Sequence, residues 1–139
     1  EAIFYDLSSL KARPTEVARM SDPAAHLHDR DFSSDRPGRS YESVGGARHA
    51  IARENEPRRR EAVKFAKEIA GRLDQDRRKK EYEQLIVVAA APFRSLMRTE
   101  FSTDTTACIV HEVPKDLVHS PVEVLREHLP TTVQELKSA

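Results

Sequence analysis

The sequence predicts an α/β protein with a mixed β-sheet and helices packed against that sheet. Short apolar segments typical of strands alternate with longer segments in which apolar residues recur every three or four positions. The 139 residues suffice for one compact domain, which we expect to span residues 1–139. Hydrophobic residues make up 38% of the chain and charged residues 33%, a balance that favours a folded soluble protein over a disordered one.

The N-terminal segment has the pattern of a β-hairpin followed by a long loop. Residues 2–7 are apolar and aromatic, and residues 15–20 alternate weakly after a turn that contains Pro14. Both segments are therefore predicted strands. Residues 21–51 are polar and contain several prolines and glycines, which predicts a loop. A loop of this length inside a compact domain is often functional.

A long helix is expected to begin at Asn55. Asn55 is a suitable N-cap. Pro57 would lie near the first turn, where a backbone N–H has no partner within the helix, so the missing N–H of proline costs nothing. Helical spacing predicts a buried stripe of Ala62, Phe65, Ala66, Ile69 and Leu73. Most of the cations fall elsewhere, so we expect the exposed side of this helix to be basic.

Two strands and two helices are predicted in the remainder. Residues 85–90 form a continuous apolar run, as expected of a central strand buried on both faces. Residues 93–101 are predicted to form a short helix, and residues 106–113 a strand. Ser120 has the position of a capping residue, with Pro121 at the first helical position. The helix that they open would bury Val122, Leu125 and Leu129.

The charge is distributed unevenly although the net charge is zero. Residues 36–80 carry 14 Lys and Arg against 7 Asp and Glu, and the remainder of the chain compensates. This asymmetry indicates a polyanionic partner, and the alternative is a helix face that is simply solvated. Phosphate contacts give affinity without sequence specificity, so no DNA specificity is expected.

The sequence also indicates where the protein acts. No apolar run reaches the roughly 20 residues that span a bilayer, so membrane insertion is not expected. The single cysteine, Cys108, allows no intrachain disulfide and fits a reducing compartment. Since the chain shows no signal-peptide pattern, we expect a cytoplasmic protein.

No set of residues points to catalysis. Cys108 lies in an apolar segment, where a buried inert thiol is the usual outcome. The chain has no Gly-x-Ser-x-Gly elbow and no Walker loop, so we expect it not to be an enzyme. Four nearby residues have metal-ligand chemistry, but nothing fixes their geometry, so no metal and no cofactor is expected. They are His26, His28, Asp29 and Asp31. A metal-dependent hydrolase or nuclease that uses them is the least favoured alternative.

Two stretches of the chain resemble the bacterial host attachment protein family. The first, residues 28–50, contains Asp35-Arg36-Pro37-Gly38-Arg39 and the pair Gly45-Gly46. The second, residues 115–129, is similar to the closing motif of that family. The resemblance implies a factor needed for attachment of bacteria to host cells. Family members usually begin with one more strand, so it also implies a strand before Glu1.

The element order is in turn similar to the middle domain of eukaryotic and archaeal release factors and of Pelota-type rescue factors. That resemblance implies a ribonuclease H-like layering of sheet and helices. In those domains a hairpin leads into a loop with Gly-Gly-Gln, and a long basic helix follows. Gly45-Gly46 stands at the corresponding place, but Ala47 replaces the glutamine. The resemblance therefore implies contact with the ribosome or structured RNA without peptide release.

A candidate surface for RNA or ribosome binding follows from the glycine pair and the cations. Glycine lets a backbone approach a partner closely, and the arginine fork matches phosphate. The glycines could instead only turn the chain, and the loop arginines could pair with nearby aspartates. The candidate residues are Arg36, Arg39, Gly45, Gly46, Arg48, His49, Arg58, Arg59, Lys64 and Lys67. The favoured function is non-catalytic binding in translation rescue or stress, and the alternative is attachment without RNA binding.

Overall fold

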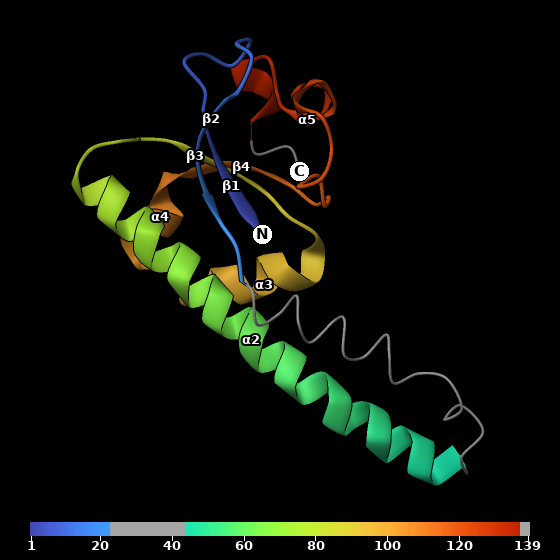
Figure 1. Ribbon diagram of the computed structural model, residues 1–139. Coiled ribbons are helices and arrows are strands. Elements are labelled where there is room, and N and C mark those ends of the chain that lie inside the picture. The colour runs from blue at the N-terminus through green and yellow to red at the C-terminus, as the bar shows by residue number, and fades with distance from the viewer. Residues whose placement is uncertain (23–43, 137–139) are drawn as a thin grey trace. The chain divides into compact units, whose positions relative to one another are not determined.

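The computed structural model describes residues 1–22 and 44–136, and over residues 44–55 it describes the helix without the side chains (Figure 1). The chain forms two compact units, residues 1–21 with 66–139 and residues 22–65. The described elements are β1 (Ala2–Asp6), β2 (Thr15–Met20), α2 (Val44–Arg78), β3 (Leu85–Val88), α3 (Ala91–Glu100), α4 (Thr103–Cys108), β4 (Ile109–Val113), α5 (Val122–His128) and the 3-10 helix η1 (Val133–Glu135). The protein is therefore of the mixed α/β class, as predicted.

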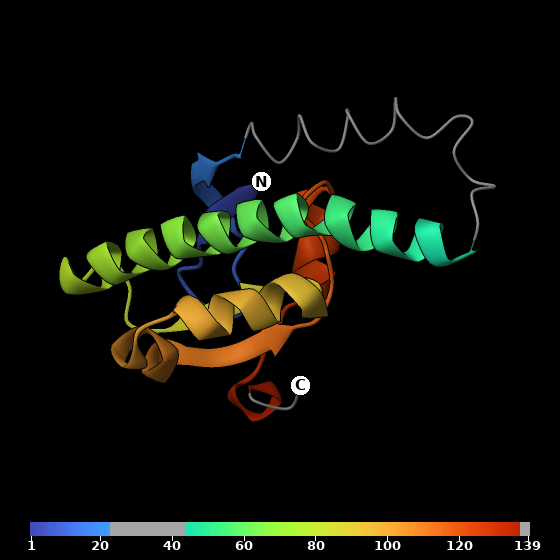
Figure 2. The ribbon, with the colours of Figure 1, turned by 90° about the horizontal axis from the view of Figure 1, so that it is seen from below.

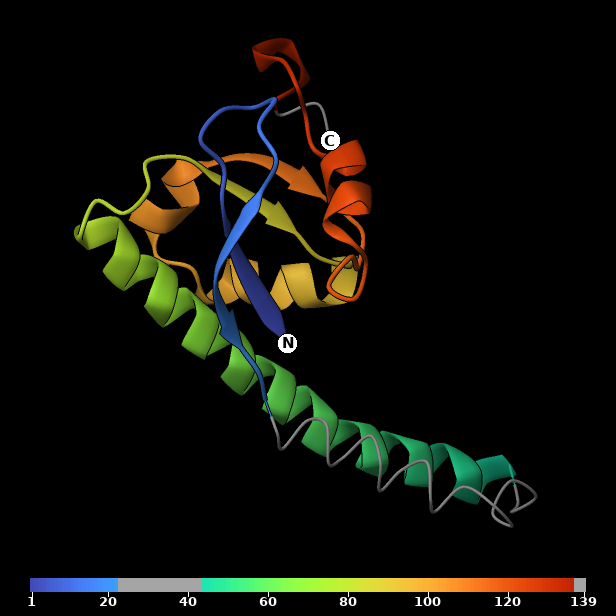
Figure 3. The same cartoon turned by 45° about the horizontal axis from the view of Figure 1, so that its top comes forward.

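The predicted hairpin is confirmed, and it contains a β-bulge. β1 and β2 pair antiparallel, and the register shift between Phe4 and Tyr5 leaves Val17 without a partner (Figure 3). The extra residue resets the alternation of side chains, so that Arg19 donates to Glu16 with its Nε 2.6 Å from the carboxylate. A bulge and charged side chains both hinder another strand from pairing with this edge.

The predicted single mixed sheet is wrong for the described residues. β1 pairs only with β2, and β3 pairs in parallel with β4, which gives two sheets of two strands each. A hairpin completes its hydrogen bonds locally, whereas parallel strands need a crossover connection, here through α3 and α4. In Figures 2 and 3, α3 and the C-terminal part of α2 lie on the same side of the β3–β4 sheet.

The predicted start of the long helix is also wrong. α2 begins at Val44 rather than Asn55, so residues 44–51 are helical and Pro57 lies inside the helix. Residues 47–56 are mostly strong helix formers, so little besides the proline, which costs roughly 3 kcal/mol inside a helix, opposes a helix over this segment. The remainder of the predicted loop, residues 23–43, lies outside the described residues.

Three boundaries in the second half differ from the prediction, each for a local reason. β3 ends at Val88 because Ala90 is already the N-cap of α3. β4 begins at Ile109, three residues later than predicted, because Ser102 caps α4 by accepting from the backbone N–H of Thr105 at 3.1 Å. In α5 the extended backbone of Pro121 makes that residue the N-cap rather than the first helical residue.

The core lies between α2, the β3–β4 sheet and the short helices. The predicted stripe on α2 is confirmed at four of its positions, with Phe65, Ala66, Ile69 and Leu73 all buried, while Ala62 is half-buried. In β3 only Val87 is buried, so this strand is not covered on both faces as predicted. Among the described residues, Ala70, Met97, Phe101, Val113 and Leu125 are buried as well.

Arg126 joins the two ends of the larger unit. Its guanidinium donates to the carbonyl oxygen of Ala12 in the β1–β2 turn at 2.5 Å and to that of Pro130 at 2.9 Å. The side chain is partly buried, and hydrogen bonds from a charged donor are stronger than neutral ones. Part of the segment that resembles the closing motif therefore fixes α5 against the hairpin.

Candidate functional site

Two exposed lysines and an arginine lie along one side of α2. Lys64 and Lys67 are exposed, and neither forms an ion pair with a residue that the structure describes. They follow Arg60 at helical spacings of four and seven residues, so the three side chains share one row. Arg60 donates to Glu56 at 3.1 Å, an exposed pair that contributes little to folding.

The other predicted site residues of α2 point elsewhere or have no described side chain. Arg59 is exposed, but it precedes Lys64 by five positions and so lies off that row. Arg58 is half-buried and shares the spacing of Ala62 and Phe65, which places it toward the buried side. Three predicted site residues are therefore exposed on this part of the helix, and two of these share a row.

The remaining predicted site residues cannot be assigned to this surface. Gly45 and Gly46 lie in the first turn of α2, which corrects the prediction that they form part of a loop. Arg48 and His49 belong to the same helix, but their side chains are outside the described part. Arg36 and Arg39 fall in the segment that the structure does not describe.

A third glycine of α2 is more informative. Gly71 is exposed inside the helix, and a Cβ built at this position would meet no described atom within 4 Å beyond the adjoining backbone of the helix itself. Glycine inside a helix costs about 1 kcal/mol relative to alanine. Since no neighbouring atom requires the missing side chain, the packing of the described residues gives no reason for glycine here. Lys67 and Arg78 lie four residues before and seven residues after it, on the same side of α2.

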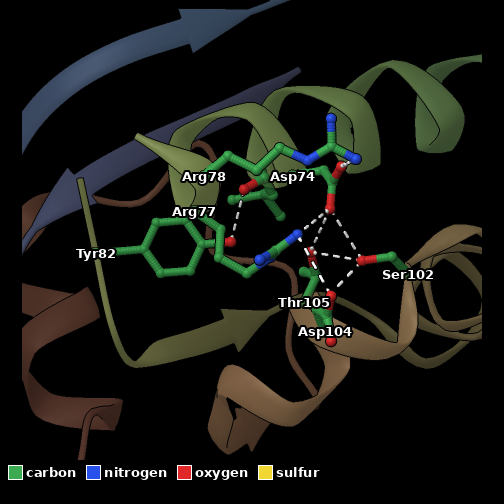
Figure 4. Close-up of polar contacts among 8 residues, drawn as sticks. Asp74, Arg77, Arg78, Tyr82, Ser102, Asp104 and Thr105 are labelled. Carbon is green, nitrogen blue, oxygen red and sulfur yellow. Dashed lines mark hydrogen bonds and ion pairs between the residues drawn. The ribbon is translucent and has the colours of Figure 1, made fainter. Parts of the chain in front are cut away.

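Asp74 is the centre of a polar cluster at the C-terminal end of α2 (Figure 4). Its carboxylate accepts from Arg77 at 2.8 Å and from the hydroxyl of Ser102 at 3.0 Å. It also pairs with Arg78 at 2.9 Å. The hydrogen bonds from Arg77 and then from Ser102 hold the pKa of Asp74 below its usual value. The cluster thus joins α2 to α4, and the contacts of Asp74 are with other side chains of the cluster.

The fully buried Thr105 completes this cluster. Its hydroxyl lies 3.1 Å from that of Ser102 and 3.5 Å from Asp74. The Tyr82 hydroxyl donates to the backbone oxygen of Leu73 at 2.7 Å, and burial raises the pKa of Tyr82. The hydroxyls of Thr105, Ser102 and Tyr82 and the carboxylate of Asp74 all have partners, whereas the buried Nε of Arg77 has none among the described residues. Polar groups that are satisfied in this way stabilise a fold.

The structure offers little for metal or thiol chemistry in the part of the chain that it describes. No group of three or more metal-ligating side chains occurs there. His26, His28, Asp29 and Asp31 lie outside it. Cys108 is half-buried at the end of α4 rather than in a strand, which corrects the predicted environment of this thiol. Among the described helices, none is long and apolar enough to cross a membrane.

Sequence reasoning did not select Arg60, Gly71 or Arg78 for the surface. All three fall on one row with Lys67, at spacings of seven, eleven and eighteen residues from Arg60. The sequence alone could have identified this row. Excluding the residues of the helix that share the spacing of the predicted buried stripe leaves the residues of the exposed side. The contact of Asp74 with Ser102 gave no such signal, since 28 residues separate the two.

Comparison with known proteins places the chain in a family. A family described as "protein required for attachment to host cells" matches residues 1–129. No curated protein and no solved structure matches the chain. The expected similarity to release factors and Pelota therefore has no support from these comparisons. The match covers most of the 139 residues, and the chain belongs to the family of proteins required for attachment to host cells.

Proposed function

We propose that this protein is a non-catalytic binding protein that promotes the attachment of bacteria to host cells. The observation that carries the proposal is the family match over residues 1–129. It favours attachment over RNA binding, which was the first function expected from the sequence. We further propose a cytoplasmic location, so that the effect on attachment is indirect.

The test is an attachment assay with a strain that lacks the gene. We expect fewer bound bacteria than with the parent strain, and recovery when the wild-type chain is supplied in trans. Equal attachment of the deletion and parent strains at matched growth would overturn the proposal. Labelling of intact cells tests the location separately, since a cytoplasmic protein is labelled only after lysis.

A second candidate function is binding to the ribosome or to structured RNA. The observation in its favour is the pair of exposed lysines on α2, Lys64 and Lys67, in one row with Arg60. Cations at this spacing can follow a phosphate backbone, and each phosphate contact lowers log affinity by about 0.7 to 0.9 per log unit of salt. Such binding supplies no catalysis, and Ala47 stands where release factors have glutamine.

Co-sedimentation with ribosomes at several salt concentrations tests this second function. The double change Lys64→Glu and Lys67→Glu should weaken binding and flatten the salt dependence. The matched control is Lys11→Glu with Lys115→Glu, two exposed lysines away from α2. Equal binding by both double variants would show that the α2 lysines are only solvated. Peptidyl-tRNA hydrolysis by the wild type would contradict the absence of catalysis.

A further inference from the structure

We draw no further inference here: the strongest candidate, the outer edges of β1 and β3, two strands with half-buried apolar side chains such as Ile3 and Ile86 whose outer edges no described strand pairs, carries no proposal because nothing in the described part of the chain shows what covers them.

Discussion

Lys80 holds a backbone conformation that glycine would adopt more easily. Its φ is 61°, and it is the one non-glycine residue with positive φ among those described. The backbone N–H of Lys80 donates to Arg77 at 3.0 Å and that of Glu81 to Asp76 at 2.9 Å, which is the hydrogen-bond pattern of a Schellman cap. The cap satisfies carbonyls at the end of α2, and the lysine Cβ makes it strained.

Lys80→Gly should therefore stabilise the protein. The relief of left-handed strain is worth roughly 1–2 kcal/mol, and the greater freedom of glycine in the unfolded chain reduces the gain to about 1 kcal/mol or less. Urea unfolding measures the change, with Lys79→Gly as the control. That control should be destabilising, because no positive φ is recorded for Lys79. A loss of stability in Lys80→Gly would mean that the cap is not formed.

Asp74 predicts a dependence of stability on pH. Arg77 and Ser102 lower its pKa below 3.8 in the folded protein, so the carboxylate stabilises the fold at pH values well above 3.8. This contribution is lost as the pH falls through the lowered pKa. The difference in unfolding free energy between wild type and Asp74→Asn should therefore be largest near neutral pH and shrink in acid.

Unfolding curves of both proteins between about pH 7 and pH 3 check this prediction. The comparison isolates Asp74, because the other carboxylates with lowered pKa values are present in both proteins. Ser102→Ala removes one donor and should move the loss of stability to higher pH. A difference that does not change with pH would show that the carboxylate charge has no role.

At the scale of elements, the position of Pro57 tests where α2 begins. Inside the helix, proline removes one hydrogen bond and clashes with the preceding turn. Pro57→Ala should then raise the helix content and stabilise the protein by about 1–3 kcal/mol. Circular dichroism and thermal unfolding measure both effects. Destabilisation would instead indicate that the helix begins near Asn55, where proline suits the first turn.

The buried row of α2 makes a second prediction for an element. Ile69 is 4% exposed, so Ile69→Ala removes buried apolar surface and leaves a cavity. The expected cost is roughly 2–5 kcal/mol in unfolding free energy. Glu68→Ala, next to it on the exposed side, should change stability by less than about 0.5 kcal/mol. Similar effects of the two substitutions would show that the helix phase is wrong.

Apolar spacing predicted the hairpin, the buried row of α2 and the helices near residues 91–100 and 122–128. It failed at α4 because Thr105 and Thr106 favour strands by intrinsic preference, whereas the cap from Ser102 and its contact with Asp74 favour a helical turn. It failed at Gly45-Gly46 because two glycines indicate a break, while the strong helix formers after them extend α2 to Val44. A long-range contact decided the structure at α4, and the summed helix propensity of the following residues decided it at Gly45-Gly46.

Part of the candidate site on α2 could be predicted from the sequence. Charge asymmetry identified α2 as basic, and Lys64 and Lys67 are exposed on it. Grouping cations by position alone included Arg58, which shares the spacing of buried residues, and omitted Gly71, whose surroundings only a structure shows. Helical spacing, which can be read from the sequence, is enough to exclude Arg58. Open space beside Gly71 cannot be recognised from the sequence.

At the scale of the whole molecule, family membership supplies the main constraint on function. The match over residues 1–129 covers all of the unit of residues 22–65 and, of the larger unit, residues 1–21 and 66–129. The single domain over residues 1–139, the absence of catalysis and the cytoplasmic location stay predictions. Attachment and RNA binding also differ in what they require, since only the second depends directly on the cations of α2.

The most direct measurement is the number of bacteria attached to host cells for the parent strain, the gene deletion, and the deletion supplied with the wild-type chain. If the protein promotes attachment, the deletion should attach less and the wild-type chain should restore the parent level. A deletion strain that attaches as well as its parent, at equal growth and with loss of the protein verified, would contradict the account.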